Sequence, residues 1–155
     1  MTSWEQFATA DKSLSDFGKE RLEHRISYLA TIRPDGSPRV HPVSPFIVFG
    51  RLFLYMEPTS PKSSDLRRDP RFSIHCSIED NSGGKGEFLI RGRAKEMLDQ
   101  KTRESVFSSA EDIGFQPQER YVLFELMLTE ARSTVYQDGE PVRSFWKAQQ
   151  GEQAK

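Results

Sequence analysis

The chain has 155 residues, a length typical of a single domain, with 35% apolar and 29% charged residues. Its 22 basic and 23 acidic residues leave a formal net charge of −1, which argues against a nucleic-acid footprint or an anionic-membrane partner. The 11 phenylalanines argue against disorder, because disordered chains lack such hydrophobic anchors.

The cysteine content and the absence of long apolar runs bear on the compartment. A single cysteine, Cys76, excludes an intrachain disulfide framework, and a reducing compartment is the simplest interpretation. The N-terminus lacks the basic start and apolar run of a signal peptide. No stretch approaches the roughly 20 apolar residues that span a bilayer. We therefore expect a cytoplasmic protein with no membrane or nucleic-acid partner.

The first half of the chain predicts a helix followed by hairpins. Residues 3–25 carry a helical apolar stripe, with Ser13 or Ser15 as the candidate cap. "ISYLATIR" then alternates as a strand, "PDGS" makes a turn, and "PRVHPV" returns antiparallel. A second predicted hairpin pairs "FIVFG" with "RLFLYME" and turns at Gly50-Arg51.

The second half predicts further strands around one helix. "RFSIHCSI" is a strand that ends in the loop "EDNSGGKG", and "EFLIRGRAKEML" is the next strand. Gly92 lies in the middle of that strand, which indicates a bulge or a close backbone approach. Asp99 is expected to cap the helix "QKTRESVFSSA", and a long strand "YVLFELMLTEARSTVYQ" turns at "DGE" towards "PVRSFW".

These elements predict a mainly β, α+β fold. Six or seven consecutive antiparallel strands, with two or three flanking helices, tend to close into a small barrel. No internal repeat or linker divides the chain. We expect one domain over residues 1–155, with a helical N-terminus over 1–25, a barrel over about 26–147 and a frayed tail over 148–155.

A short helix between Pro61 and Arg68 is a candidate anion site. Ser60 is a good N-cap, Pro61 suits the first helical position, and Pro70 stops the helix. Free N–H groups and the helix dipole favour an anion at this start, whereas Lys62 there has the wrong sign for the dipole. A phosphate between the N–H groups and Lys62 would resolve that conflict. The alternative is a surface lysine that extends into water.

No other motif carries chemistry by itself. The histidines at 24, 41 and 75 and the lone cysteine show no metal-ligand spacing, so no metal site is predicted. No catalytic triad motif, GxGxxG or GxxxxGK[ST] occurs, and the catalytic residues stay unknown. Arg39 and His41 are two apart on a strand, so they point to the same side, and Pro42 beside them removes a ladder donor.

Three segments in order carry a family resemblance. "SYLATIRPDGSPRVHPV", "LFLYMEPTSPKSSDLRRDPRFSI" and "GEFLIRGRAKEM" resemble the pyridoxamine 5'-phosphate oxidase-like family of FMN-binding split β-barrels, over roughly residues 26–110. The resemblance implies a six-stranded antiparallel Greek-key barrel and a homodimer with one FMN in each of two interface clefts. Arg39 and His41 would then share a face because that face lines the cleft, whereas the alternative makes Pro42 an edge marker and Arg39 a surface charge.

The resemblance also implies cofactor contacts. Arg39 matches the family position that opens the flavin-contacting strand, and Val40, His41, Pro42 and Val43 match positions whose backbone lines the isoalloxazine ring. Tyr55 and Met56 match a pair that flanks the ring on the next strand. Ser60 and Lys62 match the positions that hold the phosphate, and Glu87 matches a position that reaches the flavin from the partner subunit. Pro61 falls where the oxidases often carry a basic residue, so one phosphate contact is expected to be missing.

The C-terminus departs from the oxidases. They end with an Arg-x-His type motif that grips the vitamin's phosphate, and the spacing of Arg143 and Trp146 does not match it. Oxidation of pyridoxamine phosphate is therefore not expected, and the chain resembles the short branch of the family. Trp146 would cover the flavin or pack a dimer, and packing is the commoner fate of such a residue.

The resulting functional hypothesis is an FMN-dependent oxidoreductase that acts on an unknown small molecule. The cofactor would carry the chemistry, and His41 is a candidate acid or base only by position. A deazaflavin could replace FMN. The alternative is a non-catalytic module that binds flavin, or haem with His24, His41 or His75 as axial ligand. A single-strand nucleic-acid barrel is disfavoured because no basic groove accompanies the aromatic residues.

Overall fold

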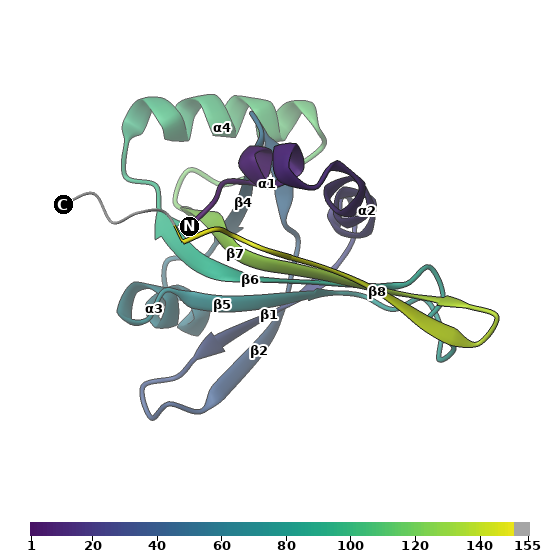
Figure 1. Ribbon diagram of the computed structural model, residues 1–155. Helices are drawn as coiled ribbons and strands as arrows, with labels where there is room; N and C mark the ends of the chain where they lie inside the picture. Colours follow the sequence, from purple (N-terminus) through teal and green to yellow (C-terminus); the bar gives the residue numbers. More distant parts are fainter. Residues whose placement is uncertain (151–155) are drawn as a thin grey trace.

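The described residues, 1–150 of a computed structural model, form one antiparallel sheet with helices on its outside (Figure 1). The strands are β1 (Ser27–Ile32), β2 (Pro38–Val43), β3 (Phe46–Val48), β4 (Arg51–Met56), β5 (Arg71–Cys76), β6 (Glu87–Glu96), β7 (Val122–Gln137) and β8 (Glu140–Lys147). The helices are α1 (Trp4–Ala10), α2 (Lys12–Leu22), α3 (Pro61–Arg68) and α4 (Gln100–Asp112). No helix within residues 1–150 is both long and apolar enough to cross a bilayer.

The order of the strands shows why the sheet curls. Its path is β2-β1-β5-β6-β7-β4-β3, and β8 pairs with the second half of β7. The two edge strands, β2 and β3, are consecutive in the chain and separated only by Ser44 and Pro45. The two edges of the sheet must therefore lie close together, although no ladder joins β2 to β3. The result is a barrel that is split along this seam, as the predicted fold class requires.

The predicted class is confirmed, and the described residues contain more elements than the six or seven strands and two or three helices expected. The seam at Pro45 separates β2 from β3, and the C-terminal segment adds β8. The predicted helix over 3–25 is divided at Asp11, whose φ of −144° ends α1. The Asp11 side chain accepts from Leu14 N–H at 3.0 Å and so caps α2. Ser3 caps α1, so the expected cap at Ser13 or Ser15 was wrong.

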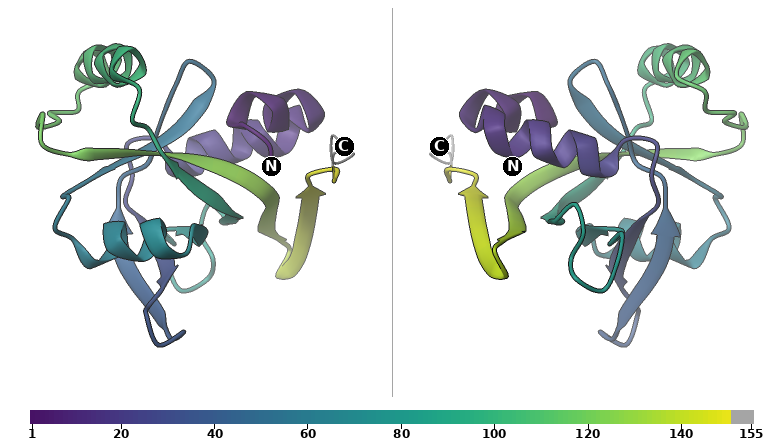
Figure 2. Two further views of the ribbon diagram at one scale, coloured as in Figure 1. Left: turned by 90° about the vertical axis from the view of Figure 1, so that its left-hand side faces the viewer. Right: turned by 90° about the vertical axis from the view of Figure 1, so that its right-hand side faces the viewer.

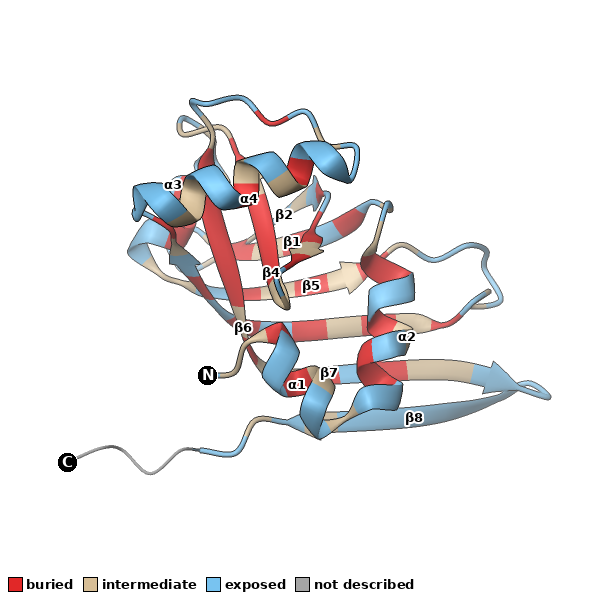
Figure 3. Ribbon diagram, turned by 90° about the horizontal axis from the view of Figure 1, so that it is seen from above, coloured by how far each residue is buried: buried red, intermediate tan, exposed pale blue. Residues whose placement is uncertain are grey.

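The core has two parts, on opposite sides of the sheet. The larger fills the barrel and the space beneath α1 and α2, and includes Leu29, Leu54, Ile74 and Phe124. The smaller lies beneath α4, around Phe53 and Val106. Figures 2 and 3 show α1 and α2 over one region of the sheet, with α4 beside them and α3 at a separate end.

The C-terminal hairpin of β7 and β8 extends beyond the barrel, and Trp146 anchors it (Figure 1). The Trp146 ring packs against Phe7 of α1 with 4.7 Å between centroids, at the margin of the larger core. Trp146 therefore packs inside the chain, which neither expected role had anticipated. Ala148 N–H donates to the Thr129 carbonyl at 2.9 Å, so the start of the predicted frayed tail is tied to β7. Residues 151–155 lie outside the described part.

Gly92 marks the bulge predicted in the middle of β6. The β6–β7 register shifts between Arg91 and Gly92, so that the backbone of β7 closes onto the glycine. A Cβ atom at Gly92 would lie 1.7 Å from the Met127 carbonyl oxygen, far inside contact distance. The constraint is steric and involves backbone on both sides, so no side-chain rotation can relieve it.

We predict that Gly92→Ala lowers the free energy of unfolding by about 2–4 kcal/mol, because two central strands must separate locally. Gly36→Ala is the control. Gly36 has a φ of +86° but no atom within 4 Å of a built Cβ, so only the backbone conformation is penalised. We expect a loss of about 1 kcal/mol there. Urea unfolding followed by circular dichroism measures both, and equal stabilities for the two variants would refute the steric account.

Candidate functional site

The edge strand β2 presents two chemically different faces. Arg39, His41 and Val43 are partly or fully buried, whereas Pro38, Val40 and Pro42 are exposed. The alternation confirms that Arg39 and His41 share a side. Because β2 pairs only with β1, its prolines lie on an open edge, where a missing N–H is tolerated.

Helix α3 has the predicted bounds, and serine hydroxyls fix its first turn. Ser60 is the N-cap, and its hydroxyl donates to the Glu57 carbonyl at 2.8 Å. Ser63 is buried and its hydroxyl donates to the Pro58 carbonyl at 3.0 Å. The Ser60 hydroxyl is therefore engaged in the turn itself, and it would have to rotate to contact a ligand. The amide of Lys62 donates to no group within residues 1–150.

The buried carboxylate of Asp65 joins α3 to the first hairpin. It accepts from Arg39 Nε of β2 at 2.7 Å, from Thr31 Oγ1 of β1 at 2.8 Å and from Arg68 of α3 at 3.0 Å. Burial alone would raise the pKa of Asp65, but these hydrogen bonds outweigh it and the pKa lies below its usual value. The sequence analysis missed Asp65, because with Arg68 it resembles an ordinary surface pair three residues apart.

Lys62 is a cation without a counterion among the described residues. It is partly buried, and no hydrogen bond or ion pair of its ammonium group occurs within residues 1–150. Glu57 is the nearby acid that acts on it, yet the Glu57 carboxylate already accepts hydrogen bonds from Nε and Nη2 of Arg120. Burial lowers the pKa of Lys62 because its charge is only partly solvated.

His41 lies in the same positive environment. Its Nε2 is shut off from solvent and has no hydrogen-bond partner in the described chain. The pKa of His41 is lowered first by burial, then by the charges of Lys62 and Arg39. His41 is therefore favoured as the neutral imidazole. Arg39, His41, Lys62 and the start of α3 together form a site that suits an anion.

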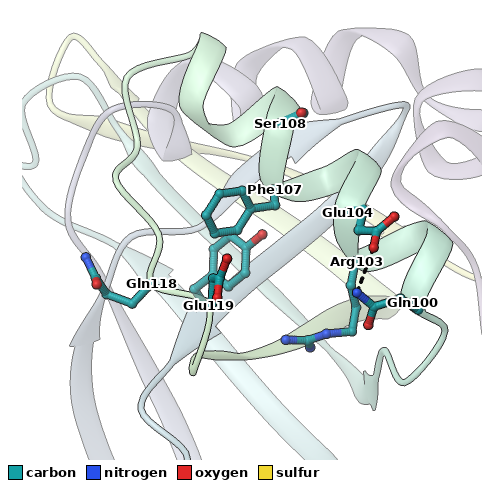
Figure 4. A pocket seen from close by; sticks show the side chains of 8 residues that line it. Gln100, Arg103, Glu104, Phe107, Ser108, Gln118 and Glu119 are labelled. Atoms are coloured by element: carbon teal, nitrogen blue, oxygen red, sulfur yellow. Dashed lines mark hydrogen bonds between the residues drawn. The ribbon is translucent and has the colours of Figure 1, made fainter.

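The pair Tyr55 and Met56 is divided between two faces of β4. Met56 is buried in the barrel core. Tyr55 lies on the opposite face, where its ring stacks on Phe46 with centroids 5.4 Å apart. Tyr55 lines a groove of about 490 Å³ between α4 and the segment before β7, whose other side chains are drawn in Figure 4. Side chains of both residues cannot contact one ligand, although their backbone can.

Glu87 lies far from α3 within one subunit. It begins β6, whose other end, Glu96, pairs with Arg67 of α3. Glu87 and Glu96 are nine positions apart along the strand, which corresponds to about 30 Å. In its own surroundings Glu87 lies 3.9 Å from Nε2 of His75. Within residues 1–150 the ion-pair partner of Glu87 is His75, and no hydrogen bond or ion pair joins Glu87 to Arg39, His41, Ser60 or Lys62.

The sequence-predicted residues thus fall into groups. Arg39, His41, Ser60 and Lys62 converge where β2 meets the start of α3, Tyr55 and Met56 diverge on β4, and Glu87 is remote. In residues 1–150 no group of three or more His, Cys, Asp or Glu side chains is arranged to hold a metal ion.

We predict that Asp65→Asn lowers the free energy of unfolding by about 1–3 kcal/mol at pH 7, because charge-assisted hydrogen bonds are lost. The pKa of Asp65 is lower in the folded state, so its contribution is present above the unfolded pKa and disappears as pH falls through the folded one. The stability difference from wild type should therefore shrink as the pH falls from about 5 towards 3.

Asp16→Asn is the matched control, because Asp16 is 62% exposed and pairs only with Lys12. Its effect should stay within about 0.5 kcal/mol. Urea unfolding at several pH values measures both variants. A difference for Asp65→Asn that does not change with pH would show that the carboxylate charge is not what stabilises this junction.

Comparison with known proteins supports the fold. No protein-family model matches the sequence, and no curated protein matches it. Among solved structures, a conserved hypothetical protein from Mycobacterium tuberculosis has a TM-score of 0.64 at 23% identity, over 79% of this chain and 82% of that one. A candidate pyridoxamine 5'-phosphate oxidase from Listeria innocua has a TM-score of 0.61 at 17% identity, over 81% and 97%.

Two further similar structures are named for a cofactor. An F420 reductase has a TM-score of 0.56 at 18% identity, over 73% of this chain and 94% of that one. A haem-binding protein from Mycobacterium smegmatis has a TM-score of 0.59 at 17% identity, over 77% and 52%. At these identities the likeness shows a shared fold. The chain has the split β-barrel fold of proteins that include flavin-type and haem-binding members.

Proposed function

We propose that this protein is an FMN-binding flavoprotein and a flavin-dependent oxidoreductase that acts on a small molecule. The observation that carries the proposal is Lys62, a partly buried cation in the first turn of α3 with no counterion within residues 1–150. A phosphate would supply the missing negative charge and accept a hydrogen bond from the free backbone amide of Lys62.

The residues present fit a flavin phosphate in charge and hydrogen-bonding capacity. Lys62 and the α3 amide would hold the phosphate, while Arg39 stays fixed by Asp65 and adds positive potential. His41 lies on the same side, and its Nε2 is unpartnered but shut off from solvent. Pro61 is the first residue of α3. At the position where the oxidases often carry a basic residue that contacts the phosphate, this chain therefore has a proline that stabilises the start of the helix.

The open edge of β2 would receive the ring. Val40 is 62% exposed, and no strand pairs with the outer side of β2. Backbone groups of residues 40–43 would hydrogen-bond the polar edge of the isoalloxazine and hold its orientation. A bound flavin would supply hydride or electron transfer, for which the chain offers no side-chain substitute.

The named neighbours define the alternatives. An F420 reductase with this fold favours a deazaflavin as the second candidate, and Lys62 does not distinguish the two cofactors. Haem is less well supported by the candidate ligands. His75 Nε2 lies 3.9 Å from a carboxylate oxygen of Glu87, and His41 Nε2 is enclosed. His24 lies in an exposed turn with a φ of +54°.

The proposal excludes pyridoxamine phosphate as the substrate. Arg143 lies exposed on β8 opposite Thr134, and no histidine accompanies it on that strand. The Arg-x-His type pair with which the oxidases bind the phosphate of the vitamin is therefore missing from the hairpin of β7 and β8.

We also propose a homodimer with the cofactor at its interface. The outer face of the sheet carries a row of paired residues, Pro42 with Tyr28, Tyr28 with His75, and His75 with Leu89. Tyr28 is 47% exposed, Pro42 is exposed, and His75 and Leu89 are partly buried. An uncovered face with several apolar residues suits association with a second copy. Dimerisation would also bring the remote Glu87 of one subunit within reach of the other's cleft.

We predict that Lys62→Ala weakens FMN binding at least about tenfold, because a charge-assisted phosphate contact is lost. Lys101→Ala is the matched control, since Lys101 is likewise the second residue of a helix, α4, but is exposed. A visible absorption spectrum and an FMN titration of the purified protein measure both. A retained spectrum near one flavin per subunit supports the proposal, and a Soret band or equal affinity for both variants contradicts it.

For the dimer, we predict that Val40→Glu shifts the protein from dimer to monomer, because each copy would bury a charge at the interface. Leu98→Glu, at a residue that is 79% exposed between β6 and α4, should leave the dimer intact. Light scattering at micromolar concentration measures the mass. A wild-type monomer would refute the interface, and FMN affinity measured in parallel tests whether the cofactor site depends on it.

A further inference from the structure

The groove that Tyr55 lines is separate from the proposed flavin site and has its own chemistry. It lies between α4 and the segment before β7, with a volume of about 490 Å³ (Figure 4). That volume is within the range of roughly 300–1,000 Å³ found for small-molecule sites. The groove stands on the face of β4 opposite to Met56, so nothing in the Lys62 argument uses it.

An unsatisfied hydroxyl lies in this groove. The Tyr55 hydroxyl is closed off from solvent and has no hydrogen-bond partner within residues 1–150. Burial raises the pKa of Tyr55, so the phenol stays neutral and can both donate and accept. Buried polar groups without partners are rare in folded proteins, and a polar ligand group that displaces the side chains over this hydroxyl would supply the missing partner.

The walls of the groove combine aromatic rings with an excess of acid. Phe107 projects from α4 into the groove and, with Tyr55, offers apolar ring faces (Figure 4). Glu104 and Glu119 line the same space, and Glu119 makes no ion pair in the described chain. Arg103 is the cation among the lining residues, and its guanidinium already donates to the carbonyls of Met97 and Tyr121.

We propose that this groove binds a small organic cation with a flat apolar part, such as an aromatic amine. The ring would stack on Phe107, and the ammonium would be attracted by the aromatic faces and by Glu104 and Glu119. Arg103 would attract an anionic ligand, but its guanidinium already donates to two carbonyls and its single charge cannot balance the two carboxylates. A cation is therefore favoured over an anion. Binding needs no cofactor, whereas a role of the ligand as substrate rests on the proposed function.

The test uses three probes that share one ring and differ in charge: 2-phenylethylamine, 2-phenylethanol and phenylacetate. Each is titrated at pH 7 into cofactor-free protein, and backbone amide shifts are followed by NMR. We expect the amine to shift residues 100–108 and 118–119 with a dissociation constant of order 1 mM, as for other ligands of this size. Phenylacetate should bind at least about fivefold more weakly.

Two variants separate the charge from the hydroxyl. The double variant Glu104→Gln/Glu119→Gln should weaken the amine about three- to tenfold and leave 2-phenylethanol within about twofold. Tyr55→Phe keeps the ring and should weaken 2-phenylethanol about threefold. Glu20→Gln, at an exposed acid on α2, is the control and should change nothing.

Several results would overturn the proposal. They are shifts outside the groove, phenylacetate binding as tightly as the amine, an unchanged amine affinity in the double glutamine variant, or no shifts up to about 20 mM probe. Because FMN is absent throughout, failure here leaves the Lys62 site untouched. Loss of FMN binding in Lys62→Ala would likewise say nothing about the groove.

Discussion

The buried carboxylate of Asp65 is the interaction on which the arrangement of the site depends. A charge at 1% exposure is stable only if its oxygens are satisfied, and three partners from β1, β2 and α3 satisfy them. Because those partners come from three elements, the carboxylate fixes where α3 lies against the first hairpin. The start of α3, and Lys62 with it, is thereby held beside the face of β2 that carries His41.

The same junction explains why the site is positive. Asp65 is shared between Arg39 and Arg68, and Glu57, the other acid near Lys62, is taken by Arg120. The Lys62 ammonium is partly buried, and no ion pair within residues 1–150 compensates its charge. This charge lowers the pKa of His41. An internal carboxylate at this point would have stabilised the folded chain. The described chain places no such carboxylate beside Lys62, which is consistent with a ligand that brings the negative charge. The FMN proposal rests on this unbalanced charge.

Local rules predicted what depends on a few neighbouring residues. Ser60, Pro61 and Pro70 gave the bounds of α3, and Gly92 gave the bulge, because caps, proline and a missing Cβ act within one or two turns. Asp65 could not be predicted, since its partner Thr31 is 34 residues away and only the tertiary fold brings them together. The position of Glu87 likewise depends on the register of a long strand. The divergence of Tyr55 and Met56 follows from strand geometry, whereas the family resemblance implied that both flank the flavin.

The split in the barrel has a cost that constrains what can cover β2. An unpaired edge strand invites pairing with another chain, and Pro38 and Pro42 reduce that risk by removing two backbone donors from this edge. A third strand could therefore form only an interrupted ladder along β2. A flat ring that needs a few backbone contacts, closed over by a second copy at the Tyr28 and Val40 face, suits such an edge better. The proposed cofactor and the proposed dimer thus answer the same structural problem, the open edge that the seam at Pro45 leaves behind.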